Sequence, residues 1–441
     1  MTQAPVEPQI SEELPDETLS LIELLRDGSQ AFPAWLDAIA KAEREVLLEM
    51  YWFDSDTIGQ RFASALIERA RAGVEVRLIY DAIGCLGVDR AMFAAMRAAG
   101  AEVIEFHPIH PWAKRFSIAK AELRDHRKIL VVDGHVGFVG GINICDHNLP
   151  VAEGGQGWRD DAVCIRGAAL TELRALFFDS WARAGGSPPA RGGLTGWRIR
   201  RALDVAAEAQ TGEPIGTFSL ALDGVLDVIH AAASREQRDA LRAQREHLPL
   251  PRKQAALAPN AGTVQIVGHA SWGSIRTLRN LYVRRINRAK KHILIANSYF
   301  APDLRVRAAL VRAARRGVEV RVLVPHKSDV PAVAWAARAS YARLLRAGVH
   351  IHEWTSSMLH CKSAVIDGWA TVGSYNFDYR SLRYNLEVNA VTELTHFVRT
   401  LEASIRADLQ ASNPVLYDQW KLRPWWHRIV EQFFYLFRKI L

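Results

Sequence analysis

The sequence is poor in cysteine and has no long hydrophobic run. Its four cysteines among 441 residues form no C-x-x-C pair, which disfavours a disulfide framework and favours a reducing, cytosolic compartment. No stretch of about 18 uncharged apolar residues occurs, so we expect no membrane-spanning helix, although the chain can still lie on a membrane. The first 20 residues are polar and acidic and do not resemble a signal peptide, so we interpret residues 1–20 as a flexible tail.

Metal-binding signatures are also missing. There is no H-E-x-x-H, no zinc-type Cys/His spacing and no dense acidic cluster, so we expect neither a metal nor a cofactor. Positive charge, by contrast, is in excess, with a formal net charge of +8. The charge predicts affinity for anions, and by itself it suits nucleic acid and anionic lipid equally.

The chain contains an internal repeat. The stretch GVEVR begins at Gly73 and again at Gly317, and AEREVLLEMYWF from Ala42 matches AKKHILIANSYF from Ala289. In each copy, helical patterns alternate with apolar strands, which is typical of βαβ units. We therefore predict an α/β fold of two similar halves related by a pseudo-twofold axis, each a mainly parallel mixed sheet flanked by helices.

The repeat also sets the expected boundaries. We assign residues 21–185 to the first half and 262–412 to the second. Between them, residues 186–261 begin with GGSPPARGGLTG, whose composition is that of a linker. This insertion either covers the active site or is a surface connection, and both interpretations stay open.

Each half carries one H-x-K-x4-D stretch followed by a glycine-containing tail. The residues are His126, Lys128 and Asp133 in RDHRKILVVD, and His360, Lys362 and Asp367 in LHCKSAVID. On a strand, residues i and i+2 point to one face, so each histidine lies beside its lysine. The tails GGIN and GSYN add Gly141, Asn143, Ser374 and Asn376 as candidate substrate-binding residues.

Two histidines and two lysines can carry out phosphodiester chemistry in two steps. Lysines suit a phosphate, and an imidazole titrates near neutral pH and can act as nucleophile or general acid. One histidine would attack phosphorus, and the second would protonate the leaving alkoxide and then deprotonate the incoming hydroxyl.

These paired stretches with their GG-x-N and GS-x-N tails resemble the phospholipase D superfamily, and within it the bacterial cardiolipin synthases. Further segments that carry the resemblance are LLEMYWFDSDTIG, WRDDAVCIRG, NSYFAPD and GSYNFDYRSLRYNLEVN. The chain looks like the shorter type that lacks N-terminal transmembrane helices. The resemblance implies one active site at the interface of the halves, with His126 as nucleophile and His360 as acid/base, and the reverse assignment stays open.

The resemblance also implies acidic residues that orient the histidines. Asp160 and Asp161 in WRDD and Glu387 in NLEVN are the candidates, and each could serve its own half or the opposite one. Asp133 and Asp367, which we group with the catalytic residues, either contact the substrate or stabilise the turn that follows each strand.

The C-terminal segment, residues 413–441, is aromatic and basic. Apolar residues recur at helical spacing, and the tail KLRPWWHRIVEQFFYLFRKIL contains one acid. Such a helix either lies in a membrane interface or packs on the protein's own core.

Together these features favour a cardiolipin synthase on the cytoplasmic face of the bacterial inner membrane. Phosphatidylglycerol would be donor and acceptor, an anionic phospholipid surface the partner, and no nucleic acid is expected. A lipid-hydrolysing phospholipase D, a nuclease of the same superfamily and a catalytically silent lipid-binding scaffold are the alternatives. The oligomeric state is not predicted.

Overall fold

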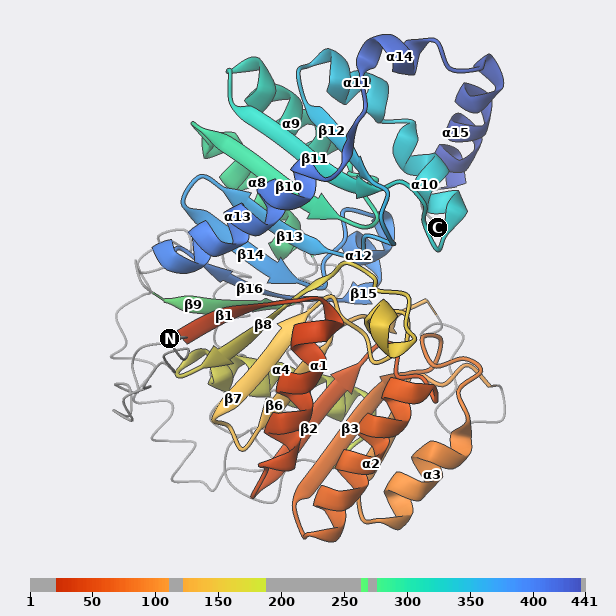
Figure 1. Ribbon diagram of the computed structural model, residues 1–441, viewed down its shortest axis with the longest axis vertical. Coiled ribbons are helices and arrows are strands. Elements are labelled where there is room, and N and C mark those ends of the chain that lie inside the picture. The colour runs from red at the N-terminus through yellow and green to blue at the C-terminus, as the bar shows by residue number, and fades with distance from the viewer. Residues whose placement is uncertain (1–20, 111–121, 188–262, 269–275, 438–441) are drawn as a thin grey trace, which may run out of the picture. The chain divides into compact units, whose positions relative to one another are not determined.

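The computed structural model describes residues 21–110, 122–187, 263–268 and 276–437, and Figure 1 shows the arrangement of their helices and strands. Within these residues the two halves belong to one compact unit. The predictions for the tail 1–20 and for most of the insertion 186–261 fall outside the described residues.

Each half contains a mixed β-sheet, and the two sheets share one strand order. The first has seven strands in the order β1-β8-β7-β6-β2-β3-β4, and the second has eight in the order β17-β12-β11-β10-β13-β14-β16-β9. When the first sheet is read from β4 and the second from β12, each strand of one sheet has an equivalent in the other. Strand β17 is an additional strand at the edge of the second sheet. The predicted duplication is therefore confirmed at the level of topology.

The strands of the first half are β1 (Leu21–Arg26), β2 (Glu45–Met50), β3 (Glu75–Asp81), β4 (Glu102–Phe106), β6 (Ile129–Val132), β7 (Val136–Gly140) and β8 (Asp161–Arg166). Those of the second half are β9 (Val264–Gly268), β10 (His292–Asn297), β11 (Glu319–Pro325), β12 (His350–Trp354), β13 (Lys362–Ile366), β14 (Trp369–Gly373), β16 (Val388–Thr392) and β17 (Asn413–Pro414). Two short strands, β5 (Arg124–Asp125) and β15 (Asn385–Leu386), pair with each other in parallel.

Parallel pairing is confined to β2–β3–β4 in the first sheet and to β10–β11–β12 in the second. The remaining pairs are antiparallel, so the sheets are mixed and less parallel than the sequence pattern suggested. The reason is the tight turn at Asp133–Gly134, which returns the chain from β6 directly into β7. A parallel crossover needs a dozen or more residues and cannot form there.

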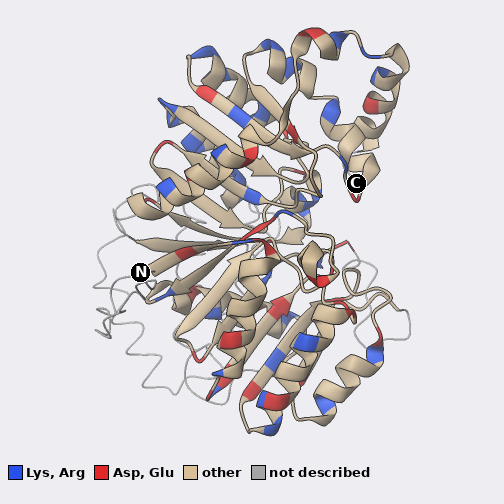
Figure 2. Cartoon of the chain, viewed as in Figure 1, with Lys and Arg blue, Asp and Glu red and all other residues tan. Residues whose placement is uncertain are grey.

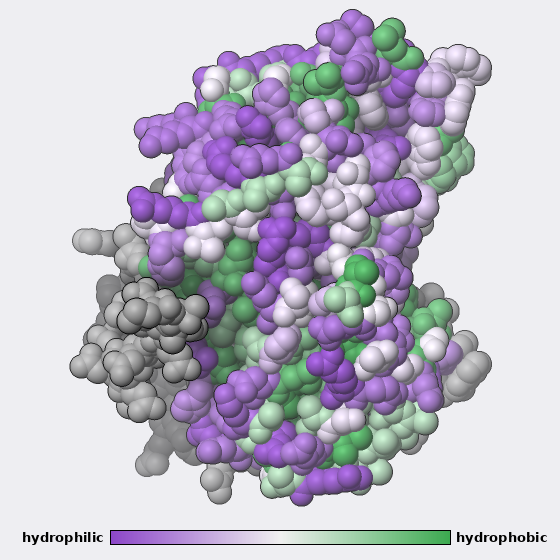
Figure 3. Space-filling view, viewed as in Figure 1, coloured by the Kyte–Doolittle hydropathy of each residue, from purple (hydrophilic) through white to green (hydrophobic). Residues whose placement is uncertain are grey.

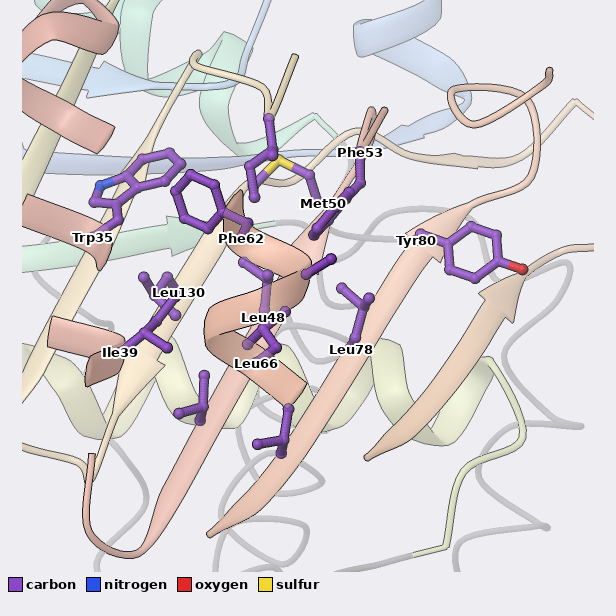
Figure 4. Packing of buried hydrophobic residues seen from close by; sticks show 14 of the residues in the cluster. Trp35, Ile39, Leu48, Met50, Phe53, Phe62, Leu66, Leu78, Tyr80 and Leu130 are labelled. Atoms are coloured by element: carbon purple, nitrogen blue, oxygen red, sulfur yellow. The ribbon is translucent and has the colours of Figure 1, made fainter. Parts of the chain in front are cut away.

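Helices cover both faces of the first sheet. α1 (Asp27–Ala40), α2 (Thr57–Arg71) and α3 (Arg90–Ala98) lie on one face, and α4 (Ala169–Arg183) lies on the other. Alternation along β2 explains this division, because Val46, Leu48 and Met50 join the core beneath α1 and α2. In Figure 4 the side chains of Trp35 and Phe62 pack over this row.

The second half repeats this plan. Its helices are α8 (Thr277–Arg288), α9 (Leu304–Arg315), α10 (Pro331–Arg338), α11 (Tyr341–Arg346), α12 (Tyr379–Arg383) and α13 (Thr395–Gln410). The chain continues into α14 (Tyr417–Lys421) and α15 (Trp425–Phe437). Helix α9 is capped at its start, where the Asp303 carboxylate accepts a hydrogen bond from the Val306 amide at 2.9 Å.

The halves exchange contacts reciprocally. Helix α4 of the first half contacts β9 of the second, and α13 of the second contacts β1 of the first. Strands β7 and β8 meet β14 and β16 in the same region. Lysine and arginine are spread over both halves (Figure 2). No helix among the described residues is both long enough and apolar enough to cross a bilayer.

Candidate active site

Both H-x-K stretches lie at the same edge of their sheets. Ile129, the first residue of β6, pairs with Glu49 near the carboxyl end of β2, and Lys362, the first residue of β13, pairs with Asn297 at the carboxyl end of β10. Ligands of open α/β sheets bind beyond the carboxyl ends of the parallel strands. The topology therefore places both histidines where a substrate site is expected.

Each histidine is oriented by an acid from the opposite half. Nδ1 of His126 lies 3.1 Å from Oε2 of Glu387, and Nδ1 of His360 lies 2.7 Å from Oδ2 of Asp160. Both acids are completely buried, and the histidines are 7% and 4% exposed. A carboxylate at Nδ1 holds the imidazole with its proton on that nitrogen, which leaves Nε2 for the substrate.

The backbone repeats this exchange. The His126 amide donates to the carbonyl of Leu386 at 3.1 Å, one residue before Glu387, and the His360 amide donates to the carbonyl of Arg159 at 2.7 Å, one residue before Asp160. Each histidine is thus bound through main chain and side chain to the same segment of the other half. This mutual attachment makes a single site out of two distant stretches.

The tail residues Ser374 and Gly141 support the acids. The Ser374 hydroxyl donates to Oε2 of Glu387 at 2.5 Å, and the Ser381 hydroxyl donates to Oε1 at 2.6 Å. At the matching place in the first half, a side-chain carbon on Gly141 would overlap the carboxylate of Asp160. We predicted both residues as substrate-binding, but the structure places them against the carboxylates that orient the histidines.

Asp161 does not contact a histidine. Its Oδ1 lies 2.6 Å from Nη1 of Arg159, and its Oδ2 accepts a hydrogen bond from the Ser363 hydroxyl at 2.6 Å. Of the three predicted orienting acids, only Asp160 and Glu387 occupy that position. Asp161 pairs with Arg159 instead, because successive side chains point to opposite sides and its side chain is turned away from that of Asp160.

The two lysines lie buried beside the histidines. Nζ of Lys128 donates to the carbonyl oxygen of His126 at 2.8 Å, and Nζ of Lys362 donates to the carbonyl oxygen of His360. Burial and the charge of Lys362 lower the pKa of Lys128 to about 7. Burial lowers the pKa of Lys362 as well. Two buried lysines beside the histidines form a site for an anion, whose charge would compensate both.

The histidines are held neutral by the same environment. Burial and the positive charge of Lys128 lower the pKa of His126 well below its usual value, and burial and Lys362 do the same for His360. A neutral imidazole with a free Nε2 is the nucleophilic form. A bound phosphodiester would neutralise the lysines and make protonation of one imidazole easier.

Asn143 and Asn376 are buried at the ends of the glycine tails. Oδ1 of Asn376 accepts a hydrogen bond from the Ser298 hydroxyl at 2.8 Å, which leaves its amide nitrogen to donate to a ligand. Oδ1 of Asn143 makes no hydrogen bond within the part of the chain that the structure describes. Both amides therefore remain candidates for contact with the substrate.

Asp133 and Asp367 lie away from the histidines, at the other end of their strands. Oδ1 of Asp133 accepts hydrogen bonds from the amides of Arg44 and Glu45 at 2.7 and 2.8 Å. The Asp367 carboxylate accepts hydrogen bonds from the amides of Lys290, Lys291 and His292, the last of which begins β10. At about 3.3 Å per residue, the strand separates Asp133 from Lys128 by roughly 16 Å. Their placement among the catalytic residues is therefore wrong, and the turn-stabilising alternative fits.

Three aromatic rings around the histidines were not among the predicted site residues. The ring of Tyr51 lies 4.9 Å from that of His126, and the rings of Trp158 and Tyr299 lie 5.5 and 6.2 Å from that of His360. A signal was present in MYWF, QGWRDD and NSYF, where each aromatic follows a strand or precedes an acid of the site. Periodicity alone does not separate such rings from core residues.

Two neutral imidazoles, each backed by a carboxylate and flanked by a lysine, form a site that suits phosphodiester chemistry. This arrangement at the junction of two similar α/β halves is that of the phospholipase D class. Within the described ranges, no group of three or more His, Cys, Asp or Glu side chains is arranged to hold a metal ion.

Comparisons with known proteins agree with this class. A family model described as "Cardiolipin synthase, PLD-like domain" matches residues 35–166 and 282–409. The chain is 33% identical over 409 residues to a cardiolipin synthase of Geobacillus thermodenitrificans, covering 92% of this chain and 70% of that protein. It is 31% identical over 420 residues to cardiolipin synthase 2 of Bacillus anthracis, covering 95% of this chain and 70% of that protein.

The fold is shared with a solved structure of much lower identity. The phosphatidylserine synthase of Haemophilus influenzae superposes with a TM-score of 0.64 at 14% identity, covering 95% of each chain. With the family match and the identities above, the chain belongs to the cardiolipin synthase family of the phospholipase D superfamily, a family of phosphatidyltransferases.

Proposed function

We propose that this protein transfers the phosphatidyl group of one phosphatidylglycerol to the free hydroxyl of a second, producing cardiolipin and glycerol. The observation that carries the proposal is that each histidine is oriented by an acid of the opposite half, Glu387 for His126 and Asp160 for His360. This arrangement leaves Nε2 of both histidines for one phosphate. The family relationship supplies the lipid class. The net charge of +8 suits an anionic headgroup.

In the first step, Nε2 of His126 attacks the phosphorus of the donor. The bond from phosphorus to the glycerol headgroup breaks as a P–N bond forms. His360, protonated at Nε2 once the anionic substrate is bound, delivers that proton to the departing glycerol oxygen. Lys128 and Lys362, with Asn143 and Asn376, hold the phosphoryl oxygens, where negative charge is concentrated in the transition state.

In the second step, the terminal hydroxyl of another phosphatidylglycerol attacks the phosphatidyl-histidine. His360, now neutral, accepts the hydroxyl proton, the P–N bond breaks, and His126 is regenerated. Overall, two phosphatidylglycerol molecules yield one cardiolipin and one glycerol. Water competes with the lipid hydroxyl for the same intermediate, so burial of both histidines favours transfer over hydrolysis.

The same chemistry indicates where the protein works. Both substrates and the product are membrane lipids, so we propose that the protein acts as a peripheral protein at a bilayer, on the cytoplasmic face of the bacterial inner membrane. The cysteine usage agrees with a reducing compartment.

The test is incubation of the purified protein with vesicles of phosphatidylglycerol carrying label in the headgroup glycerol and in the acyl chains, followed by separation of lipids and water-soluble products. We expect labelled cardiolipin together with free glycerol in equal amounts. Phosphatidic acid without cardiolipin would identify a hydrolase instead. Unchanged lipid together with cleavage of added DNA would overturn the assignment to lipid chemistry.

A further inference from the structure

Helix α15 presents large apolar side chains to solvent. Trp425 is 72% exposed, Ile429 58%, Phe433 54% and Leu436 72%. These positions recur at a spacing of three or four residues, so they share one face of the helix. Figure 3 shows hydrophobic surface where α15 lies. A monomeric soluble protein rarely leaves so continuous an apolar face uncovered.

The helix is nevertheless fixed to the protein. It packs on α10, and the ring of Trp335 in α10 lies 5.4 Å from that of His427. Glu431, the acid of this helix, is 2% exposed and forms an ion pair with Arg423 at 2.6 Å. The charged group is thus turned inward and paired, while the apolar side chains point outward. Helix α15 thus packs on the protein through one side and leaves a second, apolar side in solvent.

The other exposed large apolar residues are not scattered. Ile83 and Leu86 follow β3, Val151 follows β7, Leu304 follows β10 and Val330 follows β11. All of these strands end at the edge of the sheets where the two H-x-K stretches begin. Away from the C-terminal segment, the one described exception is Leu21, at the opposite end of the first sheet.

Helix α10 connects the apolar face to the active site. It begins at Pro331, just after Asp329, whose carboxylate accepts a hydrogen bond from the Tyr299 hydroxyl at 2.6 Å. The ring of Tyr299 in turn lies 6.2 Å from that of His360. In Figure 1, α10 and α15 lie toward the right of the view, whereas β1 begins at the left.

We propose that the apolar face of α15, together with the apolar residues of these loops, docks the protein on an anionic phospholipid bilayer and turns the catalytic edge toward it. The proposal rests on the proposed function for the lipid nature of the substrate. Tryptophans at the start of α15 suit the headgroup region, where their rings are favoured. The exposed Arg428 on the same helix and the net charge of +8 suit anionic headgroups.

The experiment compares full-length variants by flotation with two kinds of vesicle, phosphatidylglycerol mixed with phosphatidylcholine, and phosphatidylcholine alone. The double variant Ile429→Glu and Phe433→Glu places charge on the apolar face, and Leu21→Glu is the matched control at an equally exposed leucine. We expect the double variant to lose at least tenfold in binding to the anionic vesicles, and the control to bind as the unaltered protein does. Weaker binding of all proteins to neutral vesicles is expected.

Activity is measured in parallel on phosphatidylglycerol in vesicles and in detergent micelles. The double variant should lose about tenfold on vesicles and keep its activity in micelles, which also shows that it folds. The milder pair Ile429→Ser and Phe433→Ser should change binding in the same direction. Vesicle binding decides the docking proposal even if no cardiolipin forms, so the two proposals can fail separately.

Two results would overturn the docking proposal. One is undiminished vesicle binding by the double variant. The other is a dimer of the unaltered protein, seen by light scattering without lipid, that the double variant dissociates, because α15 would then cover a second copy of the chain.

Discussion

The two halves match on the catalytic face of their strands and differ on the opposite face. His126 and Lys128 correspond to His360 and Lys362, but the intervening residue is Arg127 in the first half and Cys361 in the second. On the neighbouring strand, Glu49 pairs with Ile129, and the equivalent register places Ala296 opposite Ser363. Behind the first catalytic strand lies Arg127 with Glu49. Behind the second lie the small side chains of Cys361 and Ser363, which bond to the Arg159 carbonyl and the Asp161 carboxylate of the first half.

The charged cluster behind the first strand is completely buried. Nη1 of Arg127 donates to the Ser180 hydroxyl at 2.8 Å and to the Leu176 carbonyl at 3.0 Å, and it lies 3.8 Å from the Glu49 carboxylate. Oε1 of Glu49 accepts a hydrogen bond from Ser180 at 2.7 Å. These polar contacts link helix α4 to β2 and to the segment that carries His126.

Glu49 also lies beside Asp125, which precedes His126. Burial and the neighbouring carboxylate of Asp125 raise the pKa of Glu49 well above its usual value, and burial raises that of Asp125. Two buried carboxyl groups in this arrangement hold one proton between them. The comparison teaches that a duplicated fold can keep its reacting groups alike while different residues stabilise the back of each catalytic strand.

The largest expected effect tests whether the two histidines have different roles. His126→Ala and His360→Ala should each reduce cardiolipin formation by about 10⁴-fold or more, because each removes a reacting group. With a donor whose headgroup leaves without protonation, such as a nitrophenyl ester, His360→Ala should still accumulate a phosphatidyl-enzyme that survives alkaline quench. His126→Ala should form none. If the His126→Ala variant instead accumulated the phosphatidyl group on His360, the two histidines would have the reverse roles.

The next effect concerns stability and the cluster of Arg127 and Glu49 behind the first catalytic strand. Glu49→Ala should lower the free energy of unfolding by about 3–5 kcal/mol, because it removes the buried carboxyl group that accepts a hydrogen bond from the Ser180 hydroxyl and lies 3.8 Å from Arg127. Adding Arg127→Met should recover much of this loss in a double-mutant cycle followed by urea denaturation. Cys361→Ala, at the position equivalent to Arg127, is the control and should cost about 1 kcal/mol. If Glu49→Ala and Cys361→Ala lowered the free energy of unfolding equally, the proposed difference between the halves would be wrong.

The pH dependence offers a third test. Burial raises the pKa of Asp160 to about 7, and this carboxyl must lose its proton to orient His360, so kcat/KM should rise with pH toward 7. Burial lowers the pKa of Lys128 to about 7, and this amine must keep its proton to bind phosphate, so kcat/KM should fall above 7. We therefore expect a narrow bell centred near pH 7.

Two variants separate the limbs of this bell. Asp160→Asn should lose about 10²-fold in rate and flatten the acidic limb. Lys128→Arg should move the alkaline limb upward, because a guanidinium remains charged throughout this range. An acidic limb that persists in Asp160→Asn would assign it to another group.

The smallest effect is expected where the halves are most alike. Several backbone amides lower the pKa of Asp133 and of Asp367, although burial by itself would raise it. Their ionised forms therefore stabilise the fold above about pH 4, and this contribution is lost as the pH falls below that value. Asp133→Asn and Asp367→Asn should each cost about 1 kcal/mol in thermal unfolding and change kcat by less than about twofold. A hundredfold loss of kcat in either variant would return that residue to the catalytic group.

Asparagine is the suitable replacement at these two positions because both backbones are left-handed, with φ of 54° at Asp133 and 50° at Asp367. The H-x-K-x4-D spacing therefore combines two functions on one strand. Its first residues carry the chemistry, and its last closes the turn. The sequence placed all three together, and only the structure separates them by the length of the strand.

Much of the fold followed from the sequence, since GVEVR and the H-x-K stretches recur in the same order in both halves. The alternation of apolar residues located the strands and helices because burial acts locally through periods of 2 and 3.6 residues. The same local rules did not reveal that β6 and β7 form an antiparallel hairpin, nor that Tyr51, Trp158 and Tyr299 surround the histidines.

The sequence by itself determined that two imidazoles, two lysines and two acids would be available in a duplicated α/β chain. Only the tertiary structure decided that Glu387 serves His126 and Asp160 serves His360, partners that are 261 and 200 residues apart. No local propensity encodes such a pairing. It arises because β5 and β15 pair across the junction and each histidine's amide binds the segment before the opposite acid.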